Sequence, residues 1–333
     1  MKNTNVRQRT FYSNSDIKNA NYKNVFIFQY NDENDEPVKI KKDKDGKEKL
    51  TVPAKKILND KKSKMYFDLL VKGNFDENDY FITLTYSEKY LPKTEAEAEA
   101  QIKKYIKDLR KEAKKRGVKI LKYIYVTENV NTGGRIHHHL LLKNCLPREL
   151  IENLWSKQAR PFCPDRERIG WANAKRIQIV CTKLKGKNNN PDYMIRISRY
   201  LTKETKARKG QKKWKQSTGL VLPGTSKADN VCSKKQFEQM TLYKAESFET
   251  SNTELIKYVK RNHKGFVISD IRREYNEFTG KFYISMKLMK RKIWLKAMNL
   301  NSVPEQEAIK AADRFMKQFE TDYKRQEMQG ALW

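Results

Sequence analysis

The chain has 333 residues, 71 of them Lys or Arg and 40 of them Asp or Glu, which gives a net charge of +31 at neutral pH. This excess predicts a polyanionic partner, either a nucleic acid or an anionic membrane surface. No apolar stretch approaches the roughly 18 residues that a membrane-spanning helix needs.

The N-terminal sequence MKNTNVRQRTFYSNSD is polar and lacks the apolar core of a signal peptide, so we expect a cytoplasmic protein. The four cysteines form no C-x-x-C pair, so neither a zinc ribbon nor a disulfide framework is indicated. Residues 1–75 are predicted to form an appended region, with strands at 25–30 and 38–42, a turn at Asp45-Gly46 and a helix at 54–72.

Residues 76–225 show the clearest pattern. Strands are expected at 81–86, 119–128, 136–142 and 175–182, and helices after Thr94, at 147–157 and after Asn190-Pro191. The resulting order is β-α-β-β-α-β-α. It predicts an α+β fold with a ferredoxin-like (split βαβ) antiparallel sheet and helices on one face, which leaves the other face free for chemistry.

Three consecutive histidines open the strand at 136–142. Because side chains alternate along a strand, His137 and His139 share one face, about 7 Å apart, while His138 points away. If Thr132-Gly133 form the turn of a hairpin, Glu128 lies directly opposite His137 and on the same face. A register shift or a longer loop with a bulge is the open alternative.

Two imidazoles and one carboxylate can hold a metal ion and leave coordination positions open for catalysis. Zinc, iron and manganese accept this ligand set, and magnesium tolerates it with added waters. We therefore predict a metal site formed by Glu128, His137 and His139. The competing interpretation is a histidine run that serves only as surface or core.

The helix after Asn190-Pro191 carries Tyr200, with Lys203 one turn further on the same side. Tyr200 is read either as a core aromatic or as a functional residue. Between residues 183 and 215 there are twelve Lys or Arg and two acidic residues, which predicts contact with a phosphate backbone. Trp214 either stacks on a base or anchors a loop. The candidate nucleic-acid-binding residues are Arg196, Arg199, Lys206, Arg208, Lys209, Lys212, Lys213 and Lys215.

Residues 226–333 are predicted to be mostly helical. A helix is expected over 282–300, which mixes Met, Trp and Lys, and another begins near Ser302 with the character of a capping box.

Three segments in this order, FITLTY (81–86), Glu128 with His137–His139, and RYLTK (199–203), resemble the three motifs of HUH-superfamily replication initiators. The likeness is to the rolling-circle Rep proteins of small single-stranded DNA phages of the microvirus type and of related plasmids. It covers residues 79–219. Two departures are the histidine at the middle position of the triplet and Arg196 four residues before Tyr200, where some phage members carry a second tyrosine.

The resemblance implies a metal-dependent (Mg²⁺ or Mn²⁺), site-specific single-stranded DNA endonuclease and ligase. Tyr200 then matches the nucleophile, Lys203 its lysine, His137 and His139 the metal-binding histidines, and Glu128 an additional ligand. The implied partners are single-stranded DNA at a replication origin and a host helicase and polymerase. The alternatives are a relaxase or transposase with the same chemistry, and a non-enzymatic nucleic-acid-binding protein. The charge disfavours an iron oxygenase.

Overall fold

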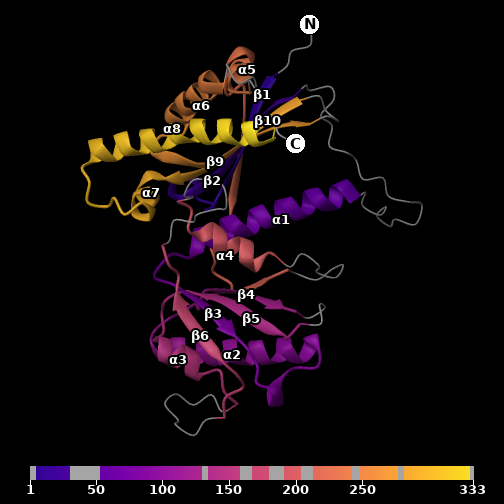
Figure 1. Ribbon diagram of the computed structural model, residues 1–333. Coiled ribbons are helices and arrows are strands. Elements are labelled where there is room, and N and C mark those ends of the chain that lie inside the picture. The colour runs from indigo at the N-terminus through magenta and orange to yellow at the C-terminus, as the bar shows by residue number, and fades with distance from the viewer. Residues whose placement is uncertain are drawn as a thin grey trace. The chain divides into compact units, whose positions relative to one another are not determined.

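The computed structural model describes residues 5–30, 53–129, 134–157, 167–179, 191–203, 213–241, 248–276 and 281–330. The chain forms two compact units (Figure 1). The terminal unit comprises Met1–Gly73, Ile179–Ile195 and Leu222–Trp333, and the site unit comprises Asn74–Gln178 and Arg196–Val221. The division into the segments 1–75, 76–225 and 226–333 stays a prediction. The class is α+β, with two antiparallel sheets.

In the terminal unit, strands from both ends of the chain pair into one five-stranded antiparallel sheet of order β8-β1-β2-β10-β9. Its strands are β1 (Asn5–Tyr12), β2 (Tyr22–Tyr30), β8 (Gly224–Asp229), β9 (Phe266–Asn276) and β10 (Lys281–Lys290). The helices are α1 (Pro53–Asn74), α5 (Lys234–Thr241), α6 (Phe248–Asn262), α7 (Arg291–Ala297) and α8 (Glu305–Gly330). The predicted strand at 25–30 and helix at 54–72 are confirmed as β2 and α1. The expected strand at 38–42 and turn at Asp45-Gly46 lie outside the described residues.

The helix predicted over 282–300 is wrong in its first half, because this stretch forms β10 and only then turns into α7. Ile284, Met286 and Leu288 alternate along β10 and are fully or almost fully buried. An alternation of period two favours a strand that buries one face. The pairing partners β2 and β9 supply that buried setting.

The site unit contains the elements predicted for residues 76–225, in the predicted order. They are β3 (Tyr80–Leu84), α2 (Glu95–Lys115), β4 (Tyr123–Glu128), β5 (His137–Leu142), α3 (Arg148–Asn153), β6 (Ala172–Arg176), α4 (Met194–Leu201, in this unit from Arg196) and the short strand β7 (Lys215–Gln216). The sheet order is β6-β3-β5-β4-β7, and every pair is antiparallel. The last of the predicted central strands begins at residue 172 and not at 175.

The two faces of this sheet have different roles. The core face carries Tyr80, Ile82, Leu84, Tyr123, Tyr125, His138, Leu140 and Leu142, and it packs against apolar residues of α2 and α3. Helix α2 begins where the Thr94 hydroxyl accepts a hydrogen bond from the amide of Glu97. Its buried stripe Ile102, Tyr105, Ile106, Leu109 and Ala113 fits the helical period. In Figure 1, α2 and α3 lie on one side of the sheet and α4 on the other.

The opposite face, called the site face below, carries Phe81, Thr83, Ile124, Val126, Glu128, His137, His139 and Leu141. Among the described residues, no helix combines the length and the apolar composition needed to cross a membrane.

Candidate metal centre and tyrosine site

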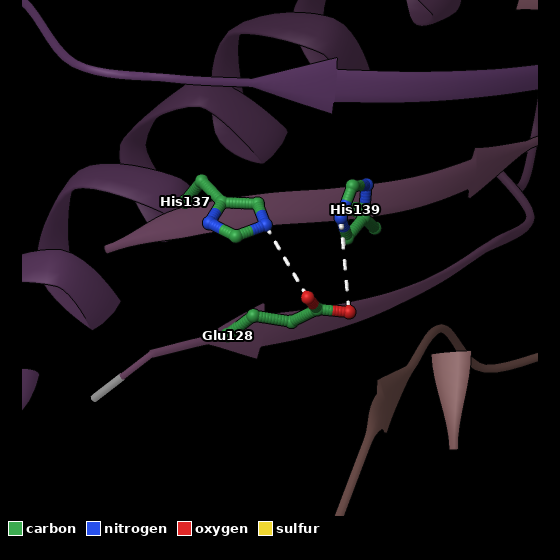
Figure 2. Close-up of side chains that lie close together, drawn as sticks. All are labelled: Glu128, His137 and His139. Carbon is green, nitrogen blue, oxygen red and sulfur yellow. Dashed lines mark ion pairs between the residues drawn. The ribbon is translucent and has the colours of Figure 1, made fainter. Parts of the chain in front are cut away.

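The register of the β4–β5 hairpin brings the predicted metal ligands together. Glu128 is paired with His137, as the sequence predicted, and Val126 is paired with His139. The predicted turn residues Thr132-Gly133 lie outside the described residues. Figure 2 shows the two imidazoles projecting from β5 toward the carboxylate of β4.

The three side chains form a compact set of ligand atoms. His137 Nε2 lies 3.3 Å from Glu128 Oε2, and His139 Nε2 lies 3.7 Å from Glu128 Oε1. One ligand atom from each residue lies within 4.8 Å of the other two. Two imidazole nitrogens and a carboxylate oxygen at this spacing fit a divalent ion, and the choice among zinc, iron, manganese and magnesium stays open.

The protonation of this site follows from burial and from the neighbouring charges. Burial alone favours the neutral carboxyl of Glu128, but the hydrogen bonds with His137 and Lys203 outweigh it and lower its pKa. The carboxylate in turn raises the pKa of His137. Burial lowers the pKa of His139 to about 4, so this imidazole is neutral at physiological pH. A neutral imidazole and an ionised carboxylate are the forms that bind metal.

Neighbouring groups orient both histidines. The carbonyl oxygen of Arg135 lies 3.0 Å from His137 Nδ1 and can only accept, so Nδ1 carries the proton and Nε2 faces Glu128. His139 Nδ1 is hydrogen-bonded to the hydroxyl of Thr83 at 3.2 Å. The ring of Phe81 stacks on His139 with an interplanar angle of 16°. Such outer partners fix ring orientation in metal sites.

Sequence reasoning did not assign roles to Phe81 and Thr83, although the strand period offered a signal. Thr83 is paired with His139 across β3 and β5, and Phe81 follows on the same face. Once the β3–β5 register is known, both positions fall on the site face.

Tyr200 reaches the same site from α4. Its hydroxyl lies 3.1 Å from His139 Nε2, the nitrogen that faces Glu128. Its ring meets Phe81 and His139 edge-on and is 40% exposed, so it is not a buried core aromatic. Tyr193, one helical stretch earlier, is buried.

Lys203 joins the tyrosine to the carboxylate. Its Nζ lies 2.8 Å from Glu128 Oε2 and 4.0 Å from the centre of the Tyr200 ring. Burial favours the neutral amine, but the interaction with Glu128 outweighs it and raises the pKa of Lys203. A cation therefore stands beside the phenol at neutral pH.

His138 lies on the core face and does not join the ligand set. Its Nε2 is hydrogen-bonded to the Tyr86 hydroxyl at 2.6 Å and its Nδ1 to the Thr127 hydroxyl at 2.9 Å. Burial lowers its pKa to about 3. The central histidine of the triplet is thus a neutral core residue whose two ring nitrogens are both hydrogen-bonded.

The predicted nucleic-acid-binding residues have varied settings. Arg196 and Arg199 are exposed on α4, and Lys213 is partly exposed. Lys215 is paired with Tyr125 and forms a 2.6 Å ion pair with Glu99, so it belongs to the core-face side of the sheet. Lys206, Arg208, Lys209 and Lys212 lie outside the described residues.

Comparison with known proteins gives one match. Residues 79–205 match a family of replication-associated proteins, described as the ORF2 and gene 2 protein type, and this segment contains Glu128, His137, His139, Tyr200 and Lys203. No curated protein and no solved structure matches the chain. The match supports a role in the initiation of replication.

Proposed function

We propose that this chain is an HUH-type replication initiator that nicks and rejoins single-stranded DNA during rolling-circle replication. One observation carries the proposal. The Tyr200 hydroxyl lies 3.1 Å from His139 Nε2, on the sheet face that also holds Glu128 and His137, within a segment that matches a replication-associated family.

The topology of the site unit supports this proposal. Strands β6-β3-β5-β4 occupy the order expected for a split βαβ sheet, with α2 between β3 and β4 and α3 between β5 and β6. We propose on this basis that the unit is ferredoxin-like. A rigid sheet places the ligands, and helix α4 carries the nucleophile.

Glu128, His137 and His139 would hold the metal ion, which we propose to be Mg²⁺ or Mn²⁺. When bound, such an ion polarises a scissile phosphate. The donor set fits this role because it contains only three protein ligands, which leaves coordination positions for water and a phosphate oxygen.

Tyr200 is the proposed nucleophile. Attack of its hydroxyl oxygen on phosphorus forms a tyrosyl–phosphate bond and breaks the bond from phosphorus to the 3′ oxygen. The phenol loses its proton and the leaving 3′ oxygen gains one. The products are a 5′-phosphotyrosyl link and a free 3′-hydroxyl, which can prime a polymerase. Later attack of a 3′-hydroxyl on the phosphotyrosine reseals the strand without ATP, because the phosphodiester energy is conserved in the link.

Lys203 assists as a fixed cation. Its ammonium lies over the Tyr200 ring and beside Glu128, where it favours phenolate character and stabilises the charge that develops on the phosphate. Arg196 and Arg199 are exposed on the same helix and are proposed to bind backbone phosphates. The proposed partners are single-stranded origin DNA and a host helicase and polymerase.

A covalent-adduct assay tests the function. The protein is incubated with end-labelled single-stranded DNA and Mn²⁺, and a denaturing gel detects label that remains attached to protein. We expect an adduct with the unaltered chain and none with His137→Ala or His139→Ala, while both variants still bind DNA. Normal cutting by both variants would refute the metal site. Failure of the unaltered chain to form any adduct across a panel of origin-containing strands would favour a non-enzymatic binding protein.

A further inference from the structure

Trp171, just before β6, is an exposed aromatic residue on the site unit. It is 66% exposed, whereas Trp155 of the same unit is 1% exposed and packs in the core. An anchoring tryptophan buries its ring, as Trp155 does. Trp171 instead offers the ring to solvent.

Backbone pairing puts Trp171 on the site face. The β3–β6 register continues beyond the strands, because the amide of Thr85 donates to the carbonyl of Trp171 at 2.9 Å and the amide of Ser87 donates to that of Ile169 at 2.9 Å. Ala172 pairs with Leu84 on the core face, so its neighbour Trp171 belongs to the opposite face.

The same register aligns Trp171 with the metal ligands. Leu84 pairs with both Ala172 and His138, so one position further along, Trp171, Thr85 and His137 form a row across three strands. Glu128 continues this row on β4. Two strand spacings separate Trp171 from His137, which is about 10 Å between their backbones.

The backbone at Trp171 is held firmly. A Cβ on Gly170 would lie 2.0 Å from the carbonyl oxygen of Thr85, so only glycine allows this approach of the two segments. The Thr85 hydroxyl also donates to the carbonyl of Trp171 at 3.3 Å. The exposed ring therefore stands on an ordered sheet edge, which reduces the entropy lost when a ligand stacks on it.

Charges near this edge suit a polyanion. Lys175 is exposed on the same face of β6, opposite Phe81. Arg135, two residues before His137, is 46% exposed and donates to the carbonyl of Tyr86 at 2.7 Å. Glu88, its ion-pair partner, is the acidic group at this end. An exposed ring between cations is the arrangement that binds single-stranded nucleic acid by stacking and phosphate contact.

We propose that Trp171 stacks on a base of the single-stranded DNA next to the phosphate that is cut, and so positions the strand across the site face. This inference rests on the proposed function. Tyr200 contacts Phe81 and His139, whereas Trp171 extends the row of His137 and Glu128 at the β6 edge. A strand held at Trp171 can then pass over the metal ligands toward Tyr200.

The test compares two probes with the full-length protein in the absence of divalent metal. One probe is oligo(dT) of about 12 nucleotides, within the usual site size of a single-strand-binding surface. The other is an abasic strand of equal length and charge. Trp171→Ala should weaken oligo(dT) binding about 5- to 150-fold and leave abasic binding unchanged, because one stack is lost and the phosphate contacts remain. Trp171→Phe should retain most of the preference for oligo(dT).

Trp214→Ala is the matched control, since this partly exposed tryptophan donates to Gln216 and is not on the β6 edge. The inference is overturned by an unchanged affinity of Trp171→Ala for oligo(dT), by an equal loss on both probes, or by loss of the base preference in Trp214→Ala alone. Because no metal or cleavage is involved, a negative result here leaves the adduct assay of Tyr200 unaffected, and the reverse also holds.

Discussion

Lys203→Ala should change metal affinity and reaction rate in opposite directions. The Lys203 ammonium lies 2.8 Å from Glu128 Oε2, so it occupies an oxygen that a metal ion would use. A divalent cation arriving between Glu128, His137 and His139 must share the carboxylate with this lysine. Removing the lysine removes the competitor.

The magnitude follows from exposure. The Lys203 side chain is 44% exposed and that of Glu128 is 2% exposed, so water screens the pair from one side only. Ion pairs with an exposed partner contribute about 0.2–1 kcal/mol, and the buried carboxylate places this pair near the upper value. Mn²⁺ should therefore bind up to about fivefold more tightly to Lys203→Ala. Adduct formation should slow by about 10- to 1000-fold, because one electrostatic contact in the transition state is lost.

Isothermal titration with Mn²⁺ measures the affinity, and the initial rate of adduct formation measures the chemistry. Lys215→Ala is the matched control, since Lys215 is also 44% exposed and ion-paired, to Glu99 on the core-face side. The control should leave Mn²⁺ affinity unchanged. Weaker Mn²⁺ binding by Lys203→Ala, or an equal change in both variants, would refute the reasoning.

Two further predictions concern DNA affinity and stability. Replacing Arg196 and Arg199 with Gln should reduce the slope of log K against log salt by about 0.7 per lost phosphate contact, with a smaller change for Lys215→Gln, whose ammonium is paired; equal slopes in all variants would contradict this. Burial lowers the pKa of His263 to about 3, whereas an unfolded histidine titrates near 6.5. The unfolded state therefore binds more protons between these values, so stability present above about pH 6.5 is lost as the pH falls toward 3, by up to about 1.4 kcal/mol per pH unit. Urea unfolding at several pH values should show a shallower dependence for His263→Gln, and an unchanged dependence would remove His263 from the explanation.

The local pattern of the sequence predicted the centre of the site well. Alternation along β5 and the position of the turn were enough to pair Glu128 with His137, because a hairpin register depends on neighbouring residues. The asparagine and proline before α4 similarly preceded a helix that carries Tyr200. These features depend on short-range geometry, which sequence period and turn chemistry report directly.

Non-local pairing was less accessible. Strand β6 reads ANAKR, with few apolar residues, and it forms because β3 pairs with it and not because of its own propensity. This missed start hid Trp171 from sequence reasoning, since its face and exposure depend on the β3–β6 register. For β10, Met, Lys and Leu suggested a helix, although Ile284, Met286 and Leu288 alternate; pairing with β2, more than 250 residues earlier, decides the strand.

The central claim is that Tyr200 is the nucleophile of a metal-dependent nicking reaction. Its most direct test is mass spectrometry of the covalent protein–DNA adduct after nuclease and protease digestion. We predict a nucleotide-modified peptide that carries the phosphate on Tyr200, absent from Tyr200→Phe and fully present in Tyr193→Phe, because Tyr193 is buried. A phosphate attached to Tyr193 or to any other residue, or an undiminished adduct in Tyr200→Phe, would contradict the account.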